Sequence, residues 1–253
     1  MSGVLITKGM RIAIPVGGLK IGFDQQGKIQ SQAKVVVHYD VCPKWLEISL
    51  EHLLQSQKCK NDLVVAWNEN NEKKIDLLEQ EFGYSIQSIM AASIALDAFY
   101  SSIKEFVEIP PTLTNLWRKK RTPRYAQIAE VLRRGFLIKP KGMKNLRNGL
   151  KEIFRFRDLA VHPLGKFEEP ILHPELNVGV EWRFIYFRFE NAKLILMASL
   201  EIIWQLINSK NISNSKIANY CKSIITLLSP IVEDWTNNFG SLIANNEKET
   251  DKK

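Results

Sequence analysis

The chain has 253 residues, of which 45% are hydrophobic and 25% charged. This excludes a disordered chain and is enough for one large domain or two small ones. The longest uncharged stretch, residues 82–96, has 15 residues, short of the roughly 20 that a membrane span needs. The N-terminus lacks a signal-cleavage site, and the three cysteines form no CxxC pair. We therefore expect a soluble cytoplasmic protein with no disulfide framework, no zinc site and no membrane contact.

The first 45 residues have strand character. Apolar runs at 4–14, 20–23 and 33–39 are separated by Gly17-Gly18 and by the turn-like residues 24–27, a pattern typical of β-hairpins. No Gly-Lys-Ser/Thr follows the glycines, so a phosphate loop is not predicted. We expect a β-rich portion at residues 1–60.

From Trp45 onward the apolar spacing becomes helical. Helices are predicted around residues 86–106, 128–136, 144–161, 192–207 and 217–235. Pro110-Pro111 must end the first of these, and Pro230 is expected to kink or break the last. Residues 181–190 fit a strand or a packed loop. The predicted fold class is mainly α, a helical bundle over residues 61–243 with a small β-containing N-terminal portion and a disordered tail at 244–253.

Positive charge is concentrated in one segment. Between Arg118 and Lys166, fifteen Lys and Arg stand against three acids, an excess of +12, so the rest of this +8 chain carries −4. Such a segment indicates a surface that faces a polyanion. Solvated helix faces with few acidic neighbours have the same composition, and this interpretation stays open.

One arginine interrupts an apolar helix face. Positions 146, 150, 153, 154, 157 and 161 share that face, and all are apolar except Arg157. A guanidinium there needs a carboxylate, a phosphate or a route to water. Pro163 restricts the preceding His162 to non-helical backbone, so the helix is predicted to end at His162.

Asp97 is a similar polar residue on the earlier long helix, and two interpretations stay open. In the first, Asp97 and Arg157 form a buried ion pair between helices, and His162 caps a helix C-terminus. In the second, Arg157 and His162 face an anion, and Asp97 or Asp158 orients them.

The run from Arg157 to His162 resembles the R-x4-6-H signature of the HEPN superfamily of small helical domains, many of them metal-independent endoribonucleases. Arg155 has an allowed spacing too, but Phe156 follows it, whereas Asp158 supplies the polar neighbour typical of the family. Asp97 is similar to a polar residue that often joins the site from an earlier helix. The resemblance covers roughly residues 79–239.

The resemblance implies RNA cleavage by attack of the 2′-hydroxyl, leaving a 2′,3′-cyclic phosphate, without metal or cofactor. His162 would move a proton, and Arg157 would hold the phosphate and stabilise transition-state charge. The family further implies a homodimer with two Arg/His pairs in one cleft. A toxin–antitoxin or antiviral-defence role, with an antitoxin or other regulatory partner, is compatible with the resemblance.

Basic residues upstream of the motif could follow an RNA backbone. These candidate nucleic-acid contacts are Arg118, Lys119, Lys120, Arg121, Arg124, Arg133, Arg134, Lys139 and Lys141. Trp117 and Tyr125 could stack bases, whereas Phe136 is expected in the core. The alternative function is a non-catalytic helical module that binds nucleic acid, a nucleotide or a protein partner. The four histidines show no metal-binding spacing.

Overall fold

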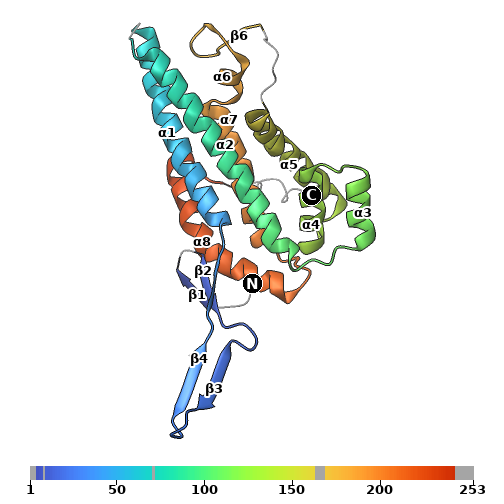
Figure 1. Cartoon of the computed structure of the whole chain (residues 1–253). Helices are drawn as coiled ribbons and strands as arrows, with labels where there is room; N and C mark the ends of the chain where they lie inside the picture. The colour runs from blue at the N-terminus through green and yellow to red at the C-terminus, as the bar shows by residue number, and fades with distance from the viewer. Residues whose placement is uncertain (1–3, 8, 70–71, 163–168, 243–253) are drawn as a thin grey trace, which may run out of the picture.

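The computed structural model describes residues 4–7, 9–69, 72–162 and 169–242, and this part of the chain is mainly helical with small N-terminal β-hairpins (Figure 1). The helices are α1 (Cys42–Asn68), α2 (Lys74–Lys104), α3 (Pro111–Lys119), α4 (Arg124–Gly135), α5 (Pro140–Val161), α6 (Trp182–Tyr186), α7 (Phe189–Ile207) and α8 (Ser215–Phe239). The strands are β1 (Val4–Thr7), β2 (Met10–Ala13), β3 (Leu19–Phe23), β4 (Ile29–Ala33), β5 (Val36–Tyr39), β6 (Ile171–Leu172) and β7 (Gly179–Val180).

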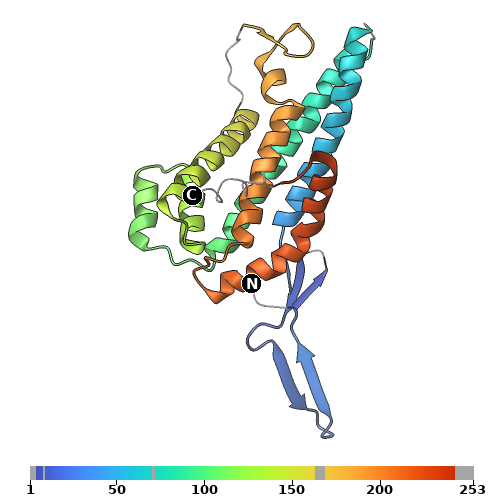
Figure 2. The ribbon, with the colours of Figure 1, turned by 180° about the vertical axis from the view of Figure 1, so that it is seen from behind.

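Helix α2 is the central element of the bundle. It packs along α1 and also contacts α4, α5 and α7, while α8 packs on α1 and α7 (Figures 1 and 2). Its core-facing apolar residues are fully buried, as the spacing of Ile89, Leu96, Phe99 and Ile103 predicts, and Glu81 and three serines are also buried on this helix. The same cluster continues through α4, α5, α7 and α8, so these helices share one core.

Prolines set several helix boundaries. Pro43, Pro111 and Pro140 lie in the first turns of α1, α3 and α5, where a missing N–H costs no intrahelical hydrogen bond. Helix α8 continues through Pro230 and changes direction along its length (Figure 2). The expected kink in the last helix is therefore confirmed, without a break in the helix.

Several predicted boundaries were wrong. The helical body begins at Cys42, not at residue 61, because α1 packs along α2 and belongs to the bundle. Helix α2 begins at Lys74, well before the predicted start at residue 86, whereas its end at Lys104 lies close to the predicted end at residue 106. Residues 182–186 form a short helix instead of a strand or loop, and α3 was not predicted. The tail predicted to be disordered, 244–253, lies outside the described residues.

The N-terminal strands form two separate units. β1, β2 and β5 make a small antiparallel sheet, whereas β3 and β4 form an antiparallel ribbon that projects from the body (Figure 1). We call residues 19–33 the arm. The predicted turn is present: the Asp24 carboxylate accepts hydrogen bonds from the N–H groups of Gln26 and Lys28, and Gly27 has φ of 75°.

Helix α2 is long and apolar enough to cross a membrane by length and composition alone, but 56% of its most apolar window is buried in the bundle. This burial is what a core helix requires, since its neighbours cover its apolar surface.

Candidate active site

Helices α2, α4 and α5 bring four predicted site residues together. Asp97 accepts a hydrogen bond from Arg124 Nε at 2.7 Å through Oδ1, and one from Arg157 Nη1 at 3.3 Å through Oδ2. Arg157 also donates from Nε and Nη2 to Asp158 Oδ1, at 3.1 and 2.8 Å. One carboxylate of α2 therefore holds an arginine from α4 and another from α5.

Each of the two guanidinium groups lies over an aromatic ring. Arg124 lies 4.4 Å from the centre of the Tyr100 ring, and Arg157 lies 4.4 Å from that of Phe154. Both rings are buried. Cation–π contact of this kind orients a guanidinium parallel to a rigid surface and adds attraction.

The arginines keep donors for a further anion. A guanidinium has five N–H groups, and Arg157 uses three of its N–H groups on Asp97 and Asp158, while Arg124 uses one on Asp97. The side chains of Arg157 and Asp97 are 24% and 28% exposed, so solvent and solutes reach them. The cluster can therefore bind a phosphate through the remaining N–H groups.

His162 lies at the end of α5, as predicted. Its backbone leaves helical conformation with φ of −119° and ψ of 78°, and its N–H donates to the Asp158 carbonyl oxygen at 2.8 Å. The residue is exposed. Among the described residues, its imidazole has no hydrogen bond or ion pair, so it is open to a ligand and is not held against Arg157.

The two interpretations of Arg157 are partly resolved. Its ion pair to Asp97 between α5 and α2 is present, but the pair is half-buried instead of buried. Val161, expected on the core-facing stripe, is 50% exposed, so the predicted apolar stripe of α5 is not buried as far as its last residue. Asp158 lies beside Arg157 and Asp97 lies across from it, so both candidate carboxylates contact this arginine.

Six of the predicted nucleic-acid contacts are exposed and form no ion pair in the described part of the chain: Arg118, Lys119, Lys120, Arg121, Lys139 and Lys141. The other three are engaged. Arg124 is bound to Asp97, and Arg133 and Arg134 both donate to Glu130, which lowers the pKa of that carboxyl despite the opposing effect of burial.

Helix α5 carries a basic stripe that the sequence reasoning missed. Lys141, Lys144, Arg147, Lys151 and Arg155 are exposed and follow one another at intervals of three or four residues. Side chains at these intervals share one helix face. The next positions of that face are Asp158 and His162. The stripe therefore leads along α5 to His162, and the same three-and-four spacing in the sequence could have revealed it.

Of the three aromatic candidates, Phe136 lies where it was predicted. It is buried and stacks on Phe99, with ring centres 6.1 Å apart, so its predicted core position is confirmed. Trp117 and Tyr125 are half-buried and pack against the core cluster. Each keeps some exposed surface near the basic residues of α3 and α4.

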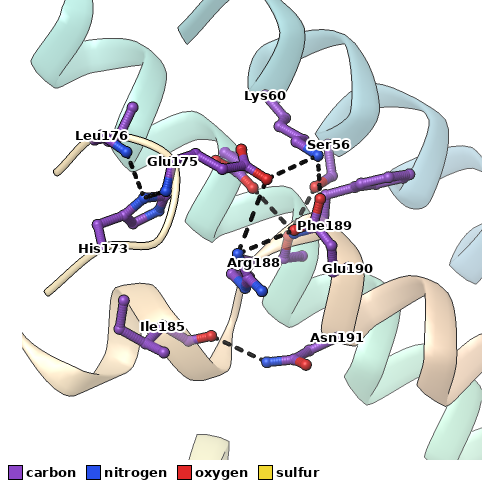
Figure 3. A network of polar contacts seen from close by, with 12 residues as sticks. Ser56, Lys60, His173, Glu175, Leu176, Ile185, Arg188, Phe189, Glu190 and Asn191 are labelled. Carbon is purple, nitrogen blue, oxygen red and sulfur yellow. Dashed lines mark hydrogen bonds and ion pairs between the residues drawn. The ribbon is translucent and has the colours of Figure 1, made fainter. Parts of the chain in front are cut away.

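A second polar cluster joins α1, α2, α7 and the β6–β7 hairpin (Figure 3). Lys60 binds Glu190, and it binds Glu175 at 3.1 Å; Arg188 lies 3.6 Å from Glu190. The Phe189 N–H donates to Glu81 at 3.0 Å. The sequence analysis did not consider Glu81, although an acid among the apolar positions of α2 is the same signal that identified Asp97.

Lys60 and Arg188 form ion pairs with Glu175 and Glu190, which favours a structural role for this second cluster, whereas Glu81 has no ion pair among the described residues. Burial raises the pKa of Glu81 to about 7, against the hydrogen bond from Phe189. Burial alone would raise the pKa of Glu190, but the hydrogen bond and charge of Lys60, a backbone N–H and the charge of Arg188 together lower it. Burial and Arg188 lower the pKa of His173, whose Nδ1 accepts N–H groups of its own turn.

Comparison with protein-family models, with curated proteins and with solved structures finds no match for this chain. The assignment of a function therefore rests on the residues themselves, above all on the arginines held by Asp97 and on the basic stripe that ends at His162.

Proposed function

We propose that this protein is a metal-independent endoribonuclease that binds RNA along α3 and α5 and cleaves it beside Arg157 and His162. The observation that carries the proposal is the shared Asp97 carboxylate, which holds Arg124 and Arg157 side by side. Both guanidiniums keep N–H groups that can donate to a bound anion. Paired guanidiniums suit a phosphodiester, whose two non-bridging oxygens accept bidentate hydrogen bonds.

The exposed basic residues support RNA as the anion. Lys and Arg without acidic partners bind a phosphate backbone and release counterions. The α5 stripe passes from Lys141 to Arg155 and continues to His162. A strand that follows this stripe brings its phosphates towards the imidazole of His162 and the arginine cluster.

The proposed reaction needs no group beyond these side chains. His162 takes the proton of the ribose 2′-hydroxyl, whose oxygen forms a bond to the adjacent phosphorus as the bond to the 5′-oxygen breaks. Solvent returns a proton to the departing 5′-oxygen. Arg157 and Arg124 stabilise the negative charge that gathers on the non-bridging oxygens in the transition state. The products are a 2′,3′-cyclic phosphate and a 5′-hydroxyl.

A second candidate function is a non-catalytic RNA-binding module. One observation favours it: Arg157 faces Asp97 on α2 and is paired there, whereas His162 is exposed and its side chain makes no hydrogen bond or ion pair among the described residues. In this alternative Arg157 serves only to link α5 to α2 through its ion pair with Asp97, and only the basic stripe contacts RNA.

The test compares Arg157→Ala with Arg155→Ala, two variants of one helix. Arg155 also precedes His162 at an allowed spacing, but it is exposed and paired with Glu152. At saturating protein we expect the wild type and Arg155→Ala to cleave mixed RNA at the same rate, although Arg155→Ala should bind RNA more weakly because Arg155 belongs to the basic stripe. Arg157→Ala should lose cleavage while keeping its helical circular dichroism. Equal cleavage by all three contradicts a role for Arg157. RNA binding without cleavage by any of them supports the binding module.

A further inference from the structure

The arm has one apolar face and one polar face. The register pairs Leu19 with Ala33, Ile21 with Ser31 and Phe23 with Ile29, and directly paired residues of a ribbon lie on the same side. These six residues, none charged, make one face. The opposite face consists of Lys20, Gly22, Gln30 and Gln32.

The part of the body that the structure describes does not cover this apolar face. Leu19 is 54% exposed, Ile21 67%, Phe23 73% and Ile29 71%. An isolated two-stranded ribbon is at best marginally stable in water and needs a covered apolar face to persist. The arm therefore needs a partner surface that is apolar, uncharged and as long as the ribbon.

The tip of the arm argues against a lipid partner. It carries Asp24, Gln25, Gln26 and Lys28, and polar and charged groups at the leading end oppose entry into hydrocarbon. The apolar side chains lie along the flank, between this polar tip and the body. Such a flank fits a second ribbon lying alongside better than a membrane entered from the tip.

We propose that the apolar face of the arm pairs with the same face of a second copy of this chain. The face is self-complementary, since it has no charge to repel its counterpart. A two-fold axis through the central pair, Ile21 and Ser31, places Phe23 over the partner's Leu19 and Ile29 over the partner's Ala33. Every contact then occurs twice, as in an isologous interface.

Exposed apolar residues next to the arm extend this interface. Ile14, Val16, Val35 and Val37 are all at least half exposed, and so are the four large apolar residues of the arm. At roughly 60–100 Å² each, such side chains offer on the order of 500–800 Å² per chain. This is close to the approximately 800 Å² that each partner of a stable complex buries.

The arm-to-arm contact is independent of the proposed ribonuclease. Helix α5 ends on the side of β6 and α6, away from the arm (Figures 1 and 2). The contact thus differs from the shared Arg/His cleft that the HEPN resemblance implies, and its failure would leave the cleavage proposal standing.

Cross-linking tests the geometry of the two-fold axis. The three native cysteines are buried, so a new cysteine is the reactive one. Packed ribbons lie roughly 10 Å apart, a gap that a short bis-maleimide bridges. We expect Ser31→Cys to give a cross-linked dimer of the full chain. Gln32→Cys, on the polar face, should remain monomeric on a denaturing gel. Equal yields from both variants would overturn the proposed pairing.

Sedimentation of the full-length protein tests the interface itself. We expect the wild type and Gln32→Asp to sediment as dimers, and Ile21→Asp to sediment as a monomer with unchanged helical circular dichroism, because a carboxylate would be buried at the two-fold axis. A monomeric wild type, or a dimeric Ile21→Asp, overturns the proposal. Binding of the wild type to neutral lipid vesicles in the monomeric state overturns it as well.

Discussion

Two arginines share the carboxylate of Asp97, and this sharing sets where their remaining N–H groups lie. Each guanidinium also rests on a buried ring, Arg124 on Tyr100 and Arg157 on Phe154. Because Asp97 contacts the arginines and not the proposed substrate, its role is positioning. Half-exposed ion pairs of this kind contribute little to stability, about 1 kcal/mol or less each.

Replacement of Asp97 by Asn tests this positioning role. We expect kcat for RNA cleavage to fall about tenfold to a hundredfold, because misplaced guanidiniums no longer match the transition state. RNA binding should tighten slightly, since a negative charge is removed beside the phosphate site. Cleavage kinetics and binding titrations separate the two effects. Asp76→Asn, an exposed position on the same helix, is the control. Weaker RNA binding by Asp97→Asn with unchanged kcat would contradict positioning.

Glu81 gives a prediction about stability and pH. Its pKa is raised from 4.5 to about 7 in the folded protein, so between these values the unfolded chain releases a proton that the folded protein retains. Stability from this group is present below pH 4.5 and is lost as pH rises to about 7. The loss amounts to about 3 kcal/mol.

Glu81→Gln should abolish that loss, because the amide oxygen can still accept the Phe189 N–H and carries no charge. Urea unfolding at pH 5 and pH 8 measures the effect. We expect the variant to gain roughly 2–3 kcal/mol over the wild type between the two pH values, because a small part of the loss has already occurred at pH 5. Glu79→Gln, an exposed neighbour, should show no such gain. A wild type and Glu81→Gln with parallel pH profiles would refute the raised pKa.

At the scale of elements, two sides of α5 have different proposed roles. Arg157 faces α2, whereas the stripe from Lys141 to Arg155 faces solvent and leads to His162. The proposed active site requires an RNA strand to pass from the second side to the end of the helix. Basic residues on the stripe should thus contribute to binding through phosphate contacts.

The double variant Lys144→Gln/Lys151→Gln tests this path. Each lost phosphate contact lowers the slope of log K against log salt by about 0.7 for single strands, so the slope should fall by roughly 1.4. Binding to unrelated RNA sequences should weaken uniformly. Lys58→Gln/Lys222→Gln, two exposed lysines on α1 and α8, is the matched control. A stripe variant with the wild-type salt slope would exclude this surface.

Local signals in the sequence predicted individual helix ends and turns well. They predicted less well the features that depend on packing between distant segments. Pro163 predicted the end of α5 at His162, and the turn at residues 24–27 predicted the hairpin. Helical spacing from Trp45 onward agreed with α1, but the predicted boundary between the β-rich portion and the bundle, at residues 60–61, fell inside this helix because its packing along α2 is a long-range feature. Helix α3 has only nine residues and none of them is buried. Its apolar positions Leu113, Leu116 and Trp117 have helical spacing, but they are too few to form the long periodic pattern by which helices are recognised.

The candidate site was predictable only in part, for the same reason. Arg157 and Asp97 each stand out as a charge on an apolar face, and the structure joins them. That Arg124 shares Asp97 depends on how α4 packs against α2, which no local pattern encodes. The partners of Glu81 likewise come from segments far apart in the sequence (Figure 3).

At the scale of the whole molecule, the helical body, with its charged face, and the projecting apolar arm have different proposed roles. The body carries the arginine cluster and the basic stripe, and the arm carries the proposed contact between copies. The two parts differ in surface chemistry: exposed large apolar residues are concentrated between Met10 and Val41, and unpaired basic residues between Arg118 and Lys151. Each part can thus be altered without disturbing the other.

The most direct measurement is incubation of the purified protein with mixed RNA in EDTA, with the product ends mapped. The wild type should leave 2′,3′-cyclic phosphates, His162→Ala should leave the RNA intact, and His52→Ala, a half-buried histidine of α1, should behave as the wild type. Cleavage by His162→Ala at the wild-type rate, or an RNA left intact by the wild type while bound to it, would contradict the proposed ribonuclease.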